Sequence, residues 1–101
     1  IGEEELKLLG PEGHIVNTSR AEIIDQAALV RCLNDGSLGG LATDVYTNEP
    51  ADNQNELVSH PKVLATPHIG YCTVETFTIF YQEMLAAFDA FKEGQPINVI
   101  N

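Results

Sequence analysis

The stretch Gly39-Gly40-Leu41-Ala42-Thr43-Asp44-Val45-Tyr46 decides the fold class of this sequence. Two glycines lead into a short run of small and apolar residues, which is typical of a buried strand over residues 41–46. A β-branched run at residues 15–18 precedes it, and a third candidate strand at residues 63–66 follows it and stops at Pro67. The nearly continuous apolar character of these strands predicts a sheet whose two faces are both covered by helices.

Helical patterns alternate with these strands. Residues 3–9 form a short predicted helix with acidic residues in its first turn. Between the first two strands, Asp25 can cap a second helix, and Gly36 is a suitable residue to end it. The apolar positions of this helix are Ala28, Leu29, Cys32 and Leu33.

The second half of the chain contains a polar segment and a long helix. Residues 47–60 are polar and predict a surface loop. After the third strand, Thr73 can cap a helix that ends at Gly94, with apolar residues every three or four positions. These residues are Phe77, Phe80, Tyr81, Met84, Leu85, Phe88 and Phe91. The order strand, helix, strand, loop, strand, helix predicts an α/β fold with a parallel sheet.

Size and charge narrow the classes of partner. The chain has 101 residues, enough for one small domain or for part of a larger one. Fifteen acidic residues against five basic ones give a formal net charge of −10, which disfavours nucleic acid and membrane surfaces as partners. No apolar run of about 18 residues is present, so no membrane span is expected.

The first residues and the two cysteines indicate what the chain lacks. The sequence begins Ile1-Gly2-Glu3, without an initiator methionine or the features of a signal peptide, so we expect upstream sequence to be missing. Cys32 and Cys72 are too far apart for a CxxC metal or redox site. Two free thiols in a cytoplasmic protein are the simplest interpretation, and no metal site is expected.

Three chemically useful side chains follow the three predicted strands. In an open parallel sheet, ligands bind beyond the carboxyl ends of the strands. Arg20, Glu49 and His68 come from the segments after strands one, two and three respectively. Taken singly, each has a simpler interpretation as a surface charge, a solvated carboxylate or a structural histidine. Their convergence on one edge of the sheet favours a functional site.

Together these groups suit the reduction of a 2-oxo acid. A guanidinium binds the carboxylate and carbonyl of such a substrate through its planar fork. An imidazole titrates near neutrality and can donate the proton. A carboxylate on its other ring nitrogen fixes the tautomer and favours the protonated ring. The hydride then comes from a nicotinamide cofactor.

Five segments, in this order, resemble the D-isomer-specific 2-hydroxyacid dehydrogenase family, which includes phosphoglycerate dehydrogenase and the glyoxylate/hydroxypyruvate reductases. The segments are Asn17-Thr18-Ser19-Arg20, residues 25–29, Asp44-Val45-Tyr46, Glu49-Pro50 and Thr66-Pro67-His68-Ile69-Gly70. Each is weak alone, but five in order and correctly spaced are specific. The match runs over nearly the whole chain, as far as residues 94–99.

The resemblance implies a role for each candidate residue. Arg20 would bind the substrate, Glu49 would pair with the imidazole, and His68 would act as acid and base. The residues implied to contact NAD or NADP are Thr18, Ser19, Arg20, Asp44, His68, Ile69, Gly70 and Tyr71. Among these, Asp44 would hold the carboxamide of the nicotinamide.

The resemblance also implies how the chain is organised. Residues 1–94 would be the second half of a Rossmann-type NAD(P)-binding domain in a two-domain enzyme. Residues 95–101 would belong to the substrate domain, which helps to form a homodimer in this family. The glycine-rich G-x-G-x-x-G motif is absent from the sequence, so the pyrophosphate-binding half is expected to lie outside this chain.

Three residues depart from the family pattern. Ala21 stands where the family usually has glycine, and a positive φ at that position would cost on the order of 1 kcal/mol. Tyr71 replaces a small residue and could narrow the active site. His14 stands where a small apolar residue is commoner, and a structural or solvent-facing position is expected for it.

Two other functions stay open at this point. Some members of the family act as nucleotide-sensing corepressors, so the chain could belong to a non-catalytic, protein-binding module. It could also be an inactive fragment that persists as a folded piece. The sequence leaves open which 2-hydroxy acid is used, the choice between NAD and NADP, and the oligomeric state.

Overall fold

The computed structural model describes residues 1–100, so the last residue of the tail predicted for residues 95–101 lies outside the described part. The chain forms two compact units, one over Ile1–Ile69 and one that begins at Gly70. The assignment of residues 1–94 to a cofactor domain stays a prediction.

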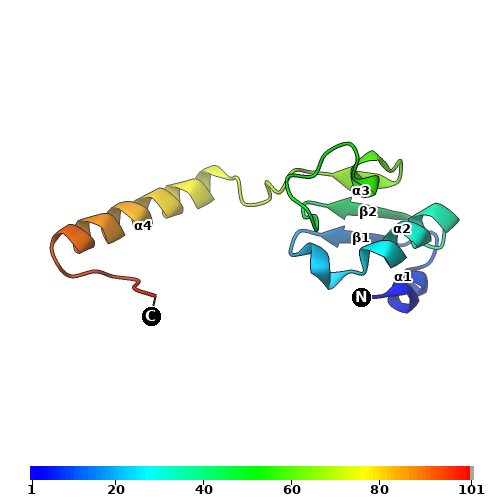
Figure 1. Cartoon of the computed structure of the whole chain (residues 1–101), viewed down its shortest axis with the longest axis horizontal. Coiled ribbons are helices and arrows are strands. Elements are labelled where there is room, and N and C mark those ends of the chain that lie inside the picture. The colour runs from blue at the N-terminus through cyan, green and yellow to red at the C-terminus, as the bar shows by residue number, and fades with distance from the viewer. Residues whose placement is uncertain (101) are drawn as a thin grey trace. The chain divides into compact units, whose positions relative to one another are not determined.

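The first unit is built on a parallel sheet of three strands, in the order β1-β2-β3. These strands are β1 (His14–Asn17), β2 (Gly40–Thr43) and β3 (Val63–Ala65), and Figure 1 shows α2 lying in front of β1 and β2. The predicted α/β fold and its parallel sheet are confirmed. β2 ends at Thr43, earlier than the predicted strand over residues 41–46, and the Asp44 N–H still donates to the Asn17 carbonyl at 3.0 Å.

The first unit contains the two predicted helices, close to their predicted bounds, and two short helical turns that the sequence did not predict. They are α1 (Glu3–Leu9), the 3₁₀ turn η1 (Ala21–Ile23), α2 (Gln26–Asp35) and α3 (Glu56–Ser59). The Asp25 carboxylate accepts the N–H of Ala28 at 3.0 Å and so caps α2. Gly36 ends the same helix with φ of 80°, in the left-handed region that glycine adopts without a steric penalty.

α3 corrects the prediction of a loop over residues 47–60. The Asn55 side chain accepts the N–H of Leu57 at 3.0 Å, and Leu57 itself is only 4% exposed. One capping residue and one buried leucine are therefore enough to form a turn of helix in a segment whose composition is otherwise that of a loop.

One face of the sheet packs against the helices. In the register of the strands, Ile15, Leu41 and Val63 are neighbours, and all three belong to or pack on the core. The buried residues of the core are Leu6, Ile24, Ala28, Leu29, Cys32, Leu33, Leu38, Leu41 and Leu57.

The opposite face of the sheet is open in the first unit. Its register neighbours are Val16, Ala42 and Leu64, of which Val16 is 70% and Leu64 is 68% exposed. The expectation of a sheet covered on both faces is therefore wrong for the described residues of this unit. Continuous apolar strands predict two covered faces, but the helices of this unit pack on one face only.

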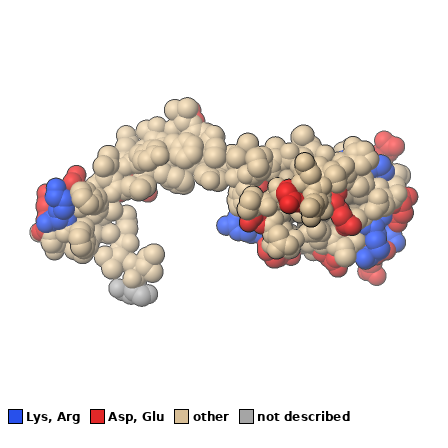
Figure 2. Space-filling view, turned by 45° about the horizontal axis from the view of Figure 1, so that its top comes forward, with Lys and Arg blue, Asp and Glu red and all other residues tan. Residues whose placement is uncertain are grey.

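The second unit consists of the long helix α4 (Val74–Lys92) and the segment after it. The Thr73 hydroxyl accepts the N–H of Thr76 at 3.1 Å, and Gly94 follows the helix with φ of 74°, as the sequence predicts. Figure 2 shows a face of α4 that is nearly free of charge, whereas acidic side chains gather on the first unit. Among the described residues, no helix is both long and apolar enough to cross a membrane.

We expect Gly36→Ala to lower the free energy of unfolding by about 1 kcal/mol, because a Cβ is disfavoured at positive φ. Gly36→Asn should cost less, since asparagine tolerates the left-handed region better. Urea unfolding of both variants measures the difference. An alanine variant as stable as the parent would show that this turn does not constrain the end of α2.

Candidate active site at the carboxyl edge of the sheet

The segment after β1 is a side-chain-stabilised turn. The Asn17 side-chain amide donates to the Arg20 carbonyl at 2.9 Å, and its oxygen accepts the N–H of Ser19 at 3.1 Å. Asn17 is buried, while Thr18, Ser19 and Arg20 are exposed. The turn therefore presents these three residues at the edge of the sheet.

The segment after β2 begins with a buried carboxylate. Asp44 is 5% exposed, and its Oδ1 accepts the Thr66 hydroxyl at 2.6 Å and the Ile69 N–H at 3.0 Å. Both donors belong to the segment after β3. Asp44 thus joins the ends of two neighbouring strands, as the parallel arrangement allows.

Tyr46 makes a second connection between the same segments. Its N–H donates to Glu49 Oε1 at 2.9 Å, and its hydroxyl donates to the Thr66 carbonyl at 2.9 Å. The side chain is buried, and burial is the main cause that raises the pKa of the phenol. Tyr46 therefore stays protonated and keeps its hydroxyl as a donor at neutral pH.

Glu49 and His68 form the central contact of the site. Glu49 Oε2 lies 2.6 Å from His68 Nδ1, and both side chains are about one-third exposed, at 34% and 39%. The hydrogen bond from His68 is the largest cause that lowers the pKa of Glu49, followed by the bond from the Tyr46 N–H. A charged Glu49 assigns a proton to Nδ1, which leaves Nε2 as the ring atom for acid–base chemistry.

His68 has an unusual backbone conformation. Its φ is +56°, in the left-handed region that non-glycine residues adopt only at a cost of about 1 kcal/mol. Strained residues of this kind gather at functional sites, where surrounding contacts hold them. Here the neighbouring residues Thr66 and Ile69 are the ones that Asp44 binds.

Arg20 is the third candidate residue at this edge of the sheet. Its guanidinium donates to the Ser19 carbonyl at 2.7 Å, and no ion pair links it to Glu49 among the described residues. Its charge nevertheless contributes, less than the two hydrogen bonds, to the lowered pKa of Glu49. The structure thus brings Glu49 and His68 into contact and places Arg20 within electrostatic range.

Comparisons with known proteins identify the family of this chain. Residues 1–70 match the family described as D-isomer specific 2-hydroxyacid dehydrogenase, NAD binding domain. The chain belongs to this family.

The curated relatives are reductases and dehydrogenases of small acids. Glycerate dehydrogenase of Methylorubrum extorquens is 34% identical over 99% of this chain and 32% of its own length. Glyoxylate reductase of Pyrococcus furiosus is 37% identical over 100% of this chain and 30% of its own length. This member of the family therefore spans less than one-third of the relatives it matches.

Solved structures show the same fold. A 2-hydroxyacid dehydrogenase from Ketogulonicigenium vulgare matches with a TM-score of 0.83 and 38% identity, over 95% of this chain and 30% of that one. An NADPH-dependent glyoxylate/hydroxypyruvate reductase from Sinorhizobium meliloti, in complex with NADP and malonate, matches with a TM-score of 0.77 and 29% identity, over 97% of this chain and 32% of that one. The sheet is accordingly part of a Rossmann-type dehydrogenase domain.

The structure shows the surroundings of the three residues at which the sequence departs from the family pattern. Ala21 lies in η1 and is not among the non-glycine residues with positive φ, so its methyl group carries no left-handed strain. His14 begins β1, is exposed, and contacts the Glu12 carbonyl through Nδ1 at 3.0 Å. Gly70 and Tyr71 fall in the second unit, where the Tyr71 ring packs edge-on against Phe77 with 6.4 Å between centroids.

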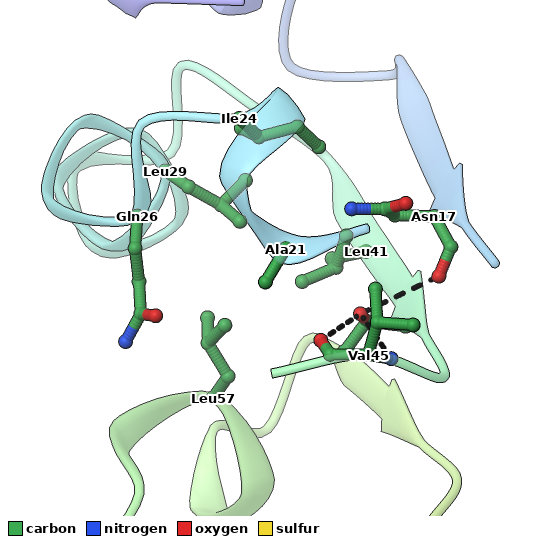
Figure 3. A pocket seen from close by; sticks show the side chains of 9 residues that line it. Asn17, Ala21, Ile24, Gln26, Leu29, Leu41, Val45 and Leu57 are labelled. Atoms are coloured by element: carbon green, nitrogen blue, oxygen red, sulfur yellow. Dashed lines mark hydrogen bonds between the residues drawn. The ribbon is translucent and has the colours of Figure 1, made fainter. Parts of the chain in front are cut away.

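A small pocket lies beside the turn after β1. It is lined by Asn17, Ala21, Ile24, Gln26, Leu29, Leu41, Thr43, Val45 and Leu57 (Figure 3). Its volume of about 10 Å³ holds one water at most and is too small for a substrate or cofactor. Within residues 1–100, no cluster of three or more His, Cys, Asp or Glu side chains could hold a metal ion.

Sequence reasoning missed three contributors to this site. Asn17 shapes the turn that carries Arg20, and Thr66 and Tyr46 connect the segments that carry His68 and Glu49. Their signal was available, because each stands at or just after the end of a predicted strand. Their particular partners depend on how the strand ends lie in space, which the sequence alone does not give.

We expect the carboxyl group of Glu49 to titrate below 4.5, and the titration to move up towards that value in His68→Ala. The stability that this contact contributes is present above the unfolded-state pKa near 4.5, and is lost as pH falls through the lower folded-state pKa. A carbon-detected NMR titration of the side-chain carboxyl measures both values. His60→Ala is the matched control and should leave the pKa of Glu49 unchanged. If His68→Ala also leaves the pKa of Glu49 unchanged, the assigned contact is contradicted.

Proposed function

We propose that the full-length protein interconverts a D-2-hydroxy acid and its 2-oxo acid with NAD or NADP. The observation that carries this proposal is the contact between Glu49 and His68 at the carboxyl edge of the sheet. A histidine oriented by a carboxylate is suited to move one proton to or from a substrate oxygen. The names of the relatives, among them glyoxylate reductase and glycerate dehydrogenase, support small 2-oxo and 2-hydroxy acids as the substrate class.

His68 is the acid and base in this proposal. In the reductive direction the protonated imidazole donates its Nε2 proton to the carbonyl oxygen, and Glu49 stabilises the ring through Nδ1. In the oxidative direction the neutral ring accepts the hydroxyl proton. The lowered pKa of Glu49 keeps its carboxylate charged through the neutral range, so the ring orientation is the same in both directions.

Arg20 binds the substrate. Its exposed guanidinium stands at the same edge as His68 and offers a planar pair of donors to the carboxylate and carbonyl of a 2-oxo acid. In the absence of substrate it contacts the Ser19 carbonyl.

The described residues fit the nicotinamide end of a dinucleotide. Asp44 supplies a carboxylate that can accept from a carboxamide, and the exposed turn of Thr18 and Ser19 supplies backbone groups beside it. The family resemblance adds Ile69, Gly70 and Tyr71, which follow His68 in the sequence, as further candidate contacts to the nicotinamide. When bound, the cofactor supplies the hydride.

We further propose that the full-length protein is a cytoplasmic homodimer. This chain covers only 30% to 32% of the length of these relatives. The remainder of a full-length protein of that size is long enough to include a substrate domain. Two free cysteines, Cys32 and Cys72, fit a reducing compartment.

The test is NADH and NADPH oxidation by the full-length polypeptide with glyoxylate, hydroxypyruvate, pyruvate and 2-oxoglutarate. We expect turnover with at least one oxo acid and a loss of about a thousandfold in His68→Ala, the range typical of a general acid. Arg20→Ala should raise KM and lower kcat/KM by about 10- to 100-fold, as for a lost bond to a charged group. His60→Ala is the control and should keep full activity.

The alternative outcomes are informative. Tight NADH binding without turnover would contradict catalysis and favour a nucleotide-sensing module. The 101-residue chain by itself should be inactive, because the described residues reach only the nicotinamide end of the cofactor. Measurable NADH turnover by the isolated chain would contradict that expectation.

A further inference from the structure

The turn that carries His68 is held from both sides by one buried carboxylate. Asp44 Oδ1 accepts the hydroxyl of Thr66, two residues before His68, at 2.6 Å. The same oxygen accepts the N–H of Ile69, the residue directly after His68, at 3.0 Å. These two bonds therefore bracket the residue whose φ is +56°.

Asp44 is itself firmly placed. The residue is 5% exposed, and its N–H donates to the Asn17 carbonyl at the end of β1 at 3.0 Å. A carboxylate held in this way fixes its partners Thr66 and Ile69 relative to the edge of the sheet. Its hydrogen bond from the Thr66 hydroxyl is short, at 2.6 Å, as is usual where a carboxylate accepts from a hydroxyl.

Thr66 also bonds to the segment that carries Glu49. Its carbonyl accepts the Tyr46 hydroxyl at 2.9 Å, and the N–H of Tyr46 donates to Glu49 at 2.9 Å. Thr66 thus connects Asp44 on one side with the residue that orients Glu49 on the other. Thr66 is therefore bonded to Asp44, which brackets His68, and to Tyr46, which binds Glu49.

We propose that the Thr66 hydroxyl is a positioning group: by binding Asp44, it holds the left-handed turn at His68 and sets the imidazole against Glu49. This role rests on the proposed dehydrogenase function and adds a residue to it. Thr66 acts through the backbone of the turn and takes no proton itself. A displacement of the ring by about 1 Å is enough to cost a large part of the catalytic rate.

The variant that tests this is Thr66→Val, which replaces the hydroxyl by a methyl group of similar size. In the full-length protein we expect kcat to fall about tenfold, with less than a threefold change in the KM for the oxo acid and in the dissociation constant of NADH. Thr66→Ser keeps the hydroxyl and should recover most of the rate. Thr78→Val, at an exposed hydroxyl that donates to the Val74 carbonyl within α4, is the matched control.

A readout independent of activity separates this proposal from the proposed function. In protein labelled with ¹⁵N-histidine, the His68 ring signals report whether Nδ1 keeps its proton and its bond to Glu49. We expect Thr66→Val to shift these signals towards those of a freely exchanging ring, and Thr66→Ser to resemble the parent. This measurement decides the proposal even if the parent reduces no oxo acid.

Several results would overturn the proposal. Unchanged His68 signals in a folded Thr66→Val would do so, as would an equal loss in the serine and valine variants, or lost NADH binding with an unchanged kcat. If the valine variant does not fold, Asp44→Asn is measured in its place. That variant removes the charge but keeps the shape, and unshifted His68 signals in it would also contradict the proposal.

Discussion

The buried carboxylate of Asp44 is the constraint on which the site depends. Parallel strands bring the segments after β1, β2 and β3 to one edge, but proximity alone does not fix side chains within tenths of an ångström. Asp44 does this by binding the Asn17 carbonyl through its N–H, and Thr66 and Ile69 through its side chain. A carboxyl group with little exposure to water requires hydrogen-bond partners, and the partners of Asp44 are groups that fix the turn at His68.

Two hydrogen-bonded connections then converge on the Glu49–His68 contact. Asp44 binds Thr66 and Ile69, on either side of His68. Tyr46 donates its N–H to Glu49 and its hydroxyl to the Thr66 carbonyl. The outcome is a carboxylate whose pKa is lowered by the histidine it orients. The proposed acid–base chemistry draws on both family membership, which comes from sequence similarity, and this geometry, which comes from contacts.

Much of this arrangement could be predicted from the sequence. Periodicity, caps and glycines located α1, α2, α4 and the three strands, because each of these signals is local. Leu57 shows the limit: its burial forms α3 in a segment whose composition indicates a loop. The open face at Val16 and Leu64 shows a second limit. An apolar strand sequence does not indicate which elements cover each face of the sheet. The sequence placed Arg20, Glu49 and His68 at one edge, but the bonds of Thr66 and Tyr46 required the structure.

The measurement that tests the central claim most directly is a structure of the full-length protein with NADH or NADPH and an unreactive 2-oxo acid analogue. The account predicts that His68 Nε2 lies within about 3.2 Å of the carbonyl oxygen of the analogue, the reach of a general acid, while Nδ1 keeps its contact with Glu49. Arg20 should donate to the carboxylate of the analogue. An analogue bound away from this edge, or an imidazole turned from Glu49 in the complex, would contradict the account.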